Sequence, residues 1–245
     1  MEDLAARYMD ARADPELVVL EGFHAIKHAL RFDAELTELR ALDPDAAGVL
    51  ADQLSPDLMP ALARELGRIS SDELSRISPR PHPTGMVAIA RRPEYDLATA
   101  LRRPGPAVLL EQPRHLGNLG ACVRVAAAAA AAALISTGDA DPWGRDALRG
   151  GAGLQFALPV LREPIPPESN RTLIAIDPTG NDLWSAELPP DALLAFGGER
   201  SGLSDELVDR ASLRLRIPMR PGVSSLNLAT SLAVVLFGVY GRRGP

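Results

Sequence analysis

The chain has 245 residues, of which 46% are hydrophobic, and its 26 basic and 32 acidic side chains give a formal net charge of −6. The length and apolar content allow two domains or one large one. The acidic balance argues against a protein that coats nucleic acid through its overall charge. The single cysteine, Cys122, excludes an internal disulfide framework and a zinc site made of cysteines, and we expect no metal site.

The N-terminal segment MEDLAARYMDARADPE is charged throughout, unlike a signal peptide. The longest apolar run, VAAAAAAAALI at 125–135, is shorter than the roughly 20 residues that a bilayer span needs. Together with the single cysteine, these observations predict a cytoplasmic protein without a membrane segment.

In the first part of the chain, short apolar runs typical of strands alternate with helical spacing. Strands are predicted at residues 16–22, 36–42 and 85–93, and helices at 23–32, 55–67 and 70–78. Ser71 is the predicted cap of the last helix. This alternation predicts a small α/β domain over residues 1–95. The polar segment 96–105 is interpreted as a linker with room for a short helix.

The second part, residues 106–245, repeats the alternation with more apolar strands. They are predicted at 107–113, 133–137, 156–161 and 213–219, at the start of 171–180 before a turn, and at the start of 192–211 before a glycine-rich loop. Helices are predicted from about Leu119, in the segment 141–153 after a loop, after Ser204, and over Leu228–Tyr240. Apolar strands separated by helices predict a mainly parallel sheet that is covered on both faces. Such sheets bind ligands at the carboxyl ends of their strands, where the loops 113–124, 197–204 and 217–227 fall.

Each of these loops has an ordinary structural explanation, but that explanation does not account for all of its polar residues. The glycine-rich FGGERSGLSDEL fits neither dinucleotide nor phosphate-loop patterns, and a turn capped by Ser204 leaves Glu199 unexplained. In VSSLN, one capping residue would suffice for the following helix, yet three small polar side chains crowd its start. Arg124, six residues after Asn118, is by itself most simply a surface residue.

Taken together and in this order, the segments NLGACVRVA, GGERSGLS and IPM…SSLNLA resemble the three signature motifs of the SpoU/TrmH family. These are S-adenosylmethionine-dependent RNA ribose 2′-O-methyltransferases of the SPOUT superfamily, and the resemblance covers about residues 106–240. The segments VLEGFHAIKHAL and HPTGMVAIARRP resemble the N-terminal, ribosomal-protein-like domain that binds RNA in many members. Two departures are PRHLGN, where the family usually has Asp-Pro, and Val125, where Thr is common.

The resemblance implies a C-terminal SPOUT-type domain with a deep trefoil knot, and a homodimer with the segment 228–241 as a candidate interface. It implies S-adenosylmethionine as cofactor, bound by Gly197, Gly198, Ile217, Met219 and Leu226. It implies a reacting centre formed by Asn118, Arg124, Glu199, Ser225 and Asn227. We expect Arg124 to stabilise the ribose alkoxide as a fixed cation. Asn118, Ser225 and Asn227 are expected to orient Arg124 and the ribose, and Glu199 to fix its loop and pair with a nearby cation.

Ribosomal RNA is the expected substrate, ahead of tRNA, and a local basic face is expected despite the net negative charge. Its predicted residues are Lys27, Arg31, Arg80, Arg91, Arg92 and Arg114. Three other functions remain open at this point: a tRNA methyltransferase, a non-catalytic RNA-binding or ribosome-assembly protein that keeps the fold, and a nucleotide-dependent oxidoreductase. The absence of a dinucleotide fingerprint after the first strand disfavours the last of these.

Overall fold

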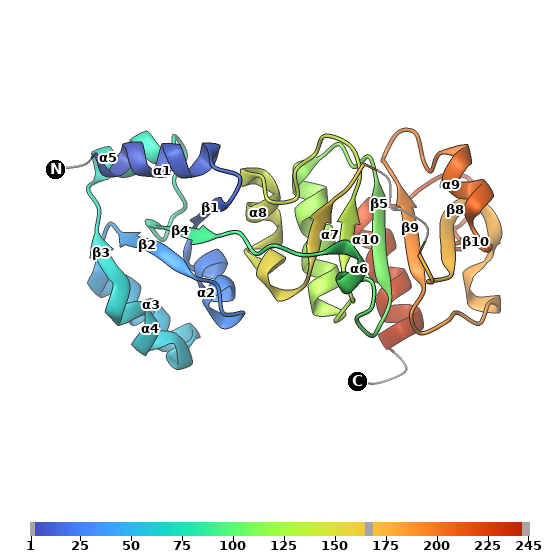
Figure 1. The fold of residues 1–245 in the computed structure, drawn as a ribbon, viewed down its shortest axis with the longest axis horizontal. Coiled ribbons are helices and arrows are strands. Elements are labelled where there is room, and N and C mark those ends of the chain that lie inside the picture. Colours follow the sequence, from blue (N-terminus) through green and yellow to red (C-terminus); the bar gives the residue numbers. More distant parts are fainter. Residues whose placement is uncertain (1–2, 165–168, 242–245) are drawn as a thin grey trace. The chain divides into compact units, whose positions relative to one another are not determined.

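The computed structural model describes residues 3–164 and 169–241, and the chain forms two compact units (Figure 1). The first unit comprises Met1–Glu94 together with Ala152–Ala157, and the second comprises Tyr95–Gly151 together with Leu158–Pro245. Among the described helices, none is both long enough and apolar enough to cross a membrane.

The first unit is a four-stranded sheet with helices on both faces (Figure 1). The strand order is β1-β4-β2-β3, in which β4 is antiparallel to β1 and β2, and β3 is parallel to β2. The strands are β1 (Leu17–Glu21), β2 (Leu36–Ala41), β3 (Leu66–Arg68) and β4 (Met86–Arg91). The helices are α1 (Leu4–Ala13), α2 (Phe23–Arg31), α3 (Pro44–Leu54), α4 (Met59–Glu65) and α5 (Ser71–Ile77), with short 3₁₀ turns at Pro56–Leu58 and Leu154–Ala157.

Continuous burial along β4 and the middle of β1 shows that both faces of this sheet are covered. Val19, Val87 and Ile89 pack against buried residues of α1 and α5, while the intervening residues of the same strands point to the opposite face. Residues 152–157 belong to this unit through α2, where Nδ1 of His28 donates to the Ala152 carbonyl at 2.7 Å.

The second unit is built on a six-stranded sheet with the order β10-β8-β9-β5-β6-β7, and every adjacent pair is parallel. The strands are β5 (Ala107–Glu111), β6 (Leu134–Ser136), β7 (Val160–Arg162), β8 (Leu173–Asp182), β9 (Leu193–Gly197) and β10 (Leu213–Arg216). The helices are α6 (Leu97–Ala100), α7 (Leu116–Ala128), α8 (Arg145–Gly151), α9 (Asp205–Arg210) and α10 (Leu228–Val235), with a 3₁₀ turn at Leu183–Ser185 and a π-helical turn at Leu236–Tyr240. The predicted mainly parallel α/β fold is confirmed.

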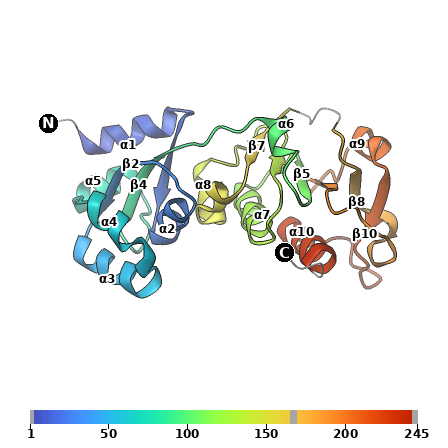
Figure 2. The same cartoon turned by 60° about the horizontal axis from the view of Figure 1, so that its bottom comes forward.

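Helices cover both faces of this sheet, with α7 and α10 on one side and α6 and α9 on the other (Figure 2). All five residues of β5 are therefore buried, as expected for a central parallel strand. Leu109 and Leu207 belong to the same buried cluster, so the face of Leu109 is the one that α9 covers. The carboxyl ends of β5, β9, β8 and β10 consequently open at one edge, where ligands bind in such sheets.

The segment 96–105, predicted as a linker, carries α6 and is held by a buried arginine. Arg171, 8% exposed, donates to four backbone carbonyls. Three of these belong to the segment and the fourth to the turn before β9: Leu101, Arg103, Gly105 and Asp191. A planar guanidinium with five donors can satisfy several carbonyls at once, so Arg171 fixes the path of the chain as it enters β5.

The structure differs from the sequence prediction at two helix starts, in two helices and in one strand. The cap of α5 is Ser70, not Ser71, because Ser70 and Glu73 form a reciprocal capping box. Helix α7 begins at Leu116, not near Leu119. The prediction also omitted α1 and α3, whose alanine-rich sequences carry weak hydrophobic periodicity, and it placed β7 too early in the chain.

Candidate active site and ligand cavity

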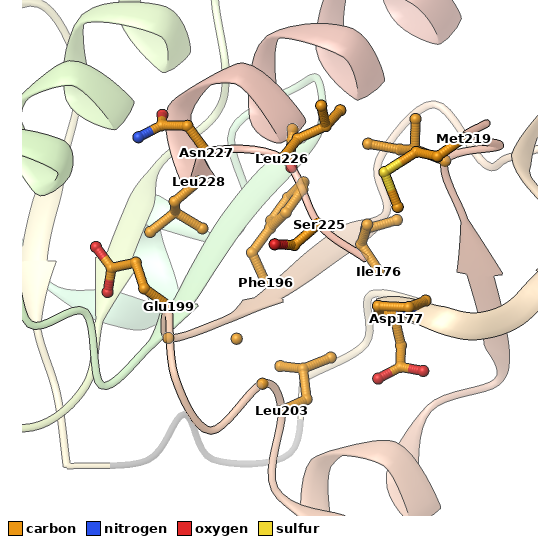
Figure 3. Close-up of a pocket in the computed structure, with 16 residues that line it drawn as sticks. Ile176, Asp177, Phe196, Glu199, Leu203, Met219, Ser225, Leu226, Asn227 and Leu228 are labelled. Carbon is orange, nitrogen blue, oxygen red and sulfur yellow. The ribbon is translucent and has the colours of Figure 1, made fainter. Parts of the chain in front are cut away.

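A cavity of about 470 Å³ lies at the carboxyl ends of β8, β9 and β10 (Figure 3). Three chain segments form its wall, and the segment 217–231 contributes the largest group. From β8 come Ile176, Asp177 and Pro178; from β9 and its loop come Phe196, Gly197, Gly198, Glu199, Gly202 and Leu203; from the last segment come Ile217, Met219, Ser225, Leu226, Asn227, Leu228 and Ser231. The five residues predicted to bind a cofactor are all in this set.

The glycine-rich loop after β9 folds back tightly on itself. A Cβ on Gly197 would lie 2.0 Å from the Gly202 carbonyl carbon, and one on Gly198 would lie 2.8 Å from the Gln112 oxygen. Gly202 has a φ of +67° and its N–H donates to the Gly198 oxygen at 3.0 Å. Only glycine fits where the loop folds back this closely. The glycines leave the backbone without side chains along one wall of the cavity.

Glu111, at the end of β5, anchors the other end of this loop. Its buried carboxylate accepts a hydrogen bond from the backbone N–H of Ser204 at 2.7 Å, just before α9. Sequence reasoning assigned Glu111 to a buried strand and gave it no role. A charged residue closing an otherwise apolar strand was the available signal, because buried carboxylates need partners.

A chain of hydrogen bonds connects the three loops on one side of the cavity. The Asn227 amide donates to Asn118 Oδ1 at 3.1 Å, and the Asn118 amide donates to Glu199 Oε1 at 2.8 Å. Asn227 Oδ1 also caps α10, accepting from the backbone N–H groups of Ala229 and Thr230. Asn227 is thus both the helix cap and a member of the polar chain, which accounts for one of the three polar residues crowded at this start.

The pKa of Glu199 is lowered from its ordinary value of 4.5. Partial burial would raise the pKa, but hydrogen bonds from the Asn118 side chain and from the backbone N–H groups of Glu199 and Arg114 outweigh it. Glu199 therefore carries its negative charge at neutral pH. Among the described residues its hydrogen-bond partners are an amide side chain and backbone N–H groups, and a charge interaction with His115 also lowers its pKa. Its expected pairing with a cation stays a prediction.

Arg124 lies apart from this polar chain. It is exposed on α7 and does not line the cavity, because six helical residues after Asn118 place it about 120° around the helix and roughly 9 Å along it. Within residues 3–164 and 169–241, its guanidinium makes no hydrogen bond or ion pair. The structure thus brings together Glu199, Ser225 and Asn227 in the wall with Asn118 behind them, and leaves Arg124 at the surface of the same helix as Asn118.

The predicted RNA-binding residues are distributed over both units. Arg31 pairs with Asp57 at 2.9 Å and Arg91 with Glu35 at 2.9 Å. Arg80 precedes β4, at the opposite end of that strand from Arg91 and Arg92. Lys27 is half-buried on α2, and Arg114 is exposed in the second unit, where its backbone N–H reaches Glu199. A common basic face stays a prediction.

The sequence matches a family model described as the SpoU rRNA Methylase family over residues 105–237. The curated relative 23S rRNA (guanosine(2553)-2′-O)-methyltransferase RlmP of Bacillus subtilis is 26% identical, with 94% of this chain and 91% of the relative aligned. An uncharacterized tRNA/rRNA methyltransferase of Mycobacterium bovis is 30% identical over 94% of this chain and 83% of its own length.

Solved structures give the same fold. An RNA 2′-O ribose methyltransferase superposes with a TM-score of 0.76 at 29% identity, covering 99% of this chain and 95% of the other. The SpoU methyltransferase AviRb from Streptomyces viridochromogenes, solved with AdoMet, superposes with a TM-score of 0.80 at 23% identity, covering 99% and 98%.

Proposed function

The chain belongs to the SpoU rRNA methylase family, and we infer that it transfers a methyl group from S-adenosylmethionine to a ribose 2′-hydroxyl of RNA. The observation that carries this inference is that two of the motif-bearing segments line one cavity, while Asn118 of the third is hydrogen-bonded to Glu199 and Asn227 in its wall. Ile176, Gly197 and Leu226 come from three separate segments of the sequence, yet they line the same space. This is the arrangement that a bound cofactor would require.

The cavity fits such a cofactor in size and chemistry. Its volume lies within the range of small-molecule sites, and Phe196, Met219 and Leu226 offer apolar surface to a purine. The negative charge of Glu199 in the wall favours a cationic ligand. When bound, S-adenosylmethionine supplies an activated methyl group on its sulfonium.

The protein's own task is to place the ribose and favour its alkoxide. The polar chain from Asn227 through Asn118 to Glu199 fixes the groups on one side of the cavity. We propose that the Arg124 guanidinium, which is free on the surface of α7, stabilises the developing negative charge of the 2′-oxygen electrostatically. An arginine keeps its proton and is therefore a poor general base.

Ribosomal RNA is the proposed substrate. Several relatives with which this chain aligns are named 23S rRNA 2′-O-methyltransferases, whereas others are named only as tRNA/rRNA methyltransferases. Mapping of 2′-O-methyl positions in total RNA from cells with and without the gene distinguishes the two substrates. A lost methyl group in tRNA alone would contradict the proposal.

We propose further that two copies associate through the C-terminal part of the second unit. Trp184 and Phe237 are 53% and 48% exposed, and a Cβ on Gly238 would lie 2.8 Å from the Trp184 ring. Exposed aromatic side chains are typical of interaction surfaces. Light scattering should give twice the 26.1 kDa chain mass, and a monomer at micromolar concentration would contradict the dimer.

The trefoil knot and the cytoplasmic location stay predictions.

The central test is binding followed by transfer. Isothermal titration should show that the folded protein binds S-adenosylhomocysteine, and radiolabelled methyl groups should then appear on rRNA at the 2′-oxygen. Binding without transfer to any RNA would support the non-catalytic alternative. Binding of NAD in place of S-adenosylhomocysteine would support the oxidoreductase.

A further inference from the structure

Asp177 stands in the cavity wall on the side opposite Glu199 (Figure 3). It lies in a bulge of β8: the pairing with β10 passes from Ala175 directly to Asn181, so residues 176–180 leave the ladder. Bulges re-aim side chains near functional sites. Here the bulge places Ile176, Asp177 and Pro178 against the cavity.

One oxygen of the Asp177 carboxylate holds the bulge together. Oδ1 accepts from the backbone N–H and the hydroxyl of Thr179 at 2.8 and 2.7 Å, and from Nε and Nη2 of Arg214 at 3.0 and 2.8 Å. Neither Thr179 nor Arg214 lines the cavity. Oδ1 is thus directed away from the cavity, and its capacity to accept hydrogen bonds is fully used.

The second oxygen, Oδ2, accepts no hydrogen bond from any residue in the described part of the chain. Glu199, the other carboxylate of the wall, differs in this respect, because Asn118 and the Arg114 backbone already donate to its two oxygens. The Asp177 side chain is 14% exposed, and Oδ2 is not among the described buried polar atoms that lack a partner, so this oxygen remains accessible from solvent. A fixed acceptor in a cavity wall, held by its partner oxygen, is suited to a ligand donor.

The charge around Asp177 indicates which kind of ligand donor would bind Oδ2. Arg214 forms an ion pair with Asp177, so this end of the cavity is close to neutral, whereas Glu199 forms no ion pair among residues 3–164 and 169–241 and has only a charge interaction with His115. A cationic group of a ligand would gain more beside Glu199, and a neutral hydroxyl would gain a charge-assisted hydrogen bond at Asp177.

We propose that Asp177 Oδ2 binds a ribose hydroxyl of S-adenosylmethionine and thereby orients the cofactor, a role that rests on the proposed function. The ammonium of the methionine part is the competing donor. Asp177 is a positioning residue in this scheme and takes no part in methyl transfer.

The test is a binding cycle measured by calorimetry with three probes: S-adenosylhomocysteine, its 2′,3′-dideoxy form and its desamino form. Asp177→Asn keeps the oxygen that Thr179 and Arg214 use but puts an amide N–H₂ in place of Oδ2. It should weaken S-adenosylhomocysteine binding about tenfold, because a charge-assisted bond is lost. The dideoxy form should bind the wild type and Asp177→Asn equally, since its ribose has no hydroxyl to lose.

Matched controls keep the outcome unambiguous. Asp209→Asn, an exposed aspartate on α9, should leave all three affinities unchanged. Asp177→Glu retains the charge but displaces the carboxylate, and it should reproduce the pattern if Asp177→Asn fails to fold. Equal affinity of wild type and Asp177→Asn for S-adenosylhomocysteine, or a loss that disappears only with the desamino form, would overturn the assignment. A wild type that does not bind S-adenosylhomocysteine would instead overturn the proposed function.

Discussion

Asn118→Asp should convert a stabilising contact of the polar chain into a repulsive one with little change in shape. In the wild type the Asn118 amide donates to Glu199 Oε1 at 2.8 Å, and the variant would put a second carboxylate in the same place. The residue is otherwise tolerant of the change, because both side chains have the same length and branching.

The magnitude follows from the geometry. Two carboxylate charges about 4 Å apart repel by about 4 kcal/mol at an effective dielectric of 20. Glu199 and Asn118 are both partly open to solvent, so screening reduces the cost to about 2 kcal/mol. For a chain of this size, that loss lowers the thermal midpoint by roughly 4–8 °C, and the repulsion raises the pKa of the carboxylate pair.

The pH dependence has a defined sign. In the wild type the pKa of Glu199 is below its ordinary value of 4.5, so its contribution to stability is present above that value and is lost as pH falls through the lowered pKa. In Asn118→Asp the repulsion exists only while both carboxylates are ionised. The difference in thermal midpoint between the two proteins should therefore be largest near pH 7.5 and small near pH 4.

Circular dichroism melting at both pH values measures this difference. Asn170→Asp, which changes an exposed asparagine of the same unit, is the control and should melt like the wild type at each pH. A destabilisation by Asn118→Asp of equal size at pH 7.5 and pH 4 would refute the electrostatic reasoning, because it would then reflect shape or the lost hydrogen bond alone.

Three further outcomes are expected. Arg124→Ala should lower the single-turnover methylation rate at saturating RNA and cofactor at least about 100-fold and leave cofactor affinity unchanged. Arg124→Lys should restore little of that rate, because a point charge does not reproduce a planar guanidinium. A wild-type rate for Arg124→Ala would exclude the catalytic role. Arg171→Met should lower the free energy of unfolding by about 3 kcal/mol and the thermal midpoint by roughly 6–12 °C, since four backbone carbonyls lose their donor. A shift in the midpoint below about 2 °C would show that water takes the place of the arginine donors. RNA affinity should fall steeply with salt, and a flat dependence would exclude an electrostatic RNA surface.

The sequence by itself determined the fold class and which loops matter. The apolar run AVLLE and its counterparts could only be strands buried on both faces, and the ordered motifs around Asn118, Glu199 and Asn227 marked three strand ends. Capping by Asn227 and Ser204 was also readable, because side-chain oxygens near helix starts satisfy free N–H groups within a few residues. All of these inferences rest on interactions local in the chain.

Only the tertiary structure decided which groups meet. The strand order β10-β8-β9-β5 brings the ends of strands more than 60 residues apart to one edge, and no local pattern specifies that order. The β8 bulge that turns Asp177 into the cavity depends on its pairing with β10. The start of α7 at Leu116 places Asn118 inside the helix and Arg124 on another of its faces. Side-chain positions of this kind follow from long-range packing, where the free energy depends on neighbours that the linear sequence does not place side by side.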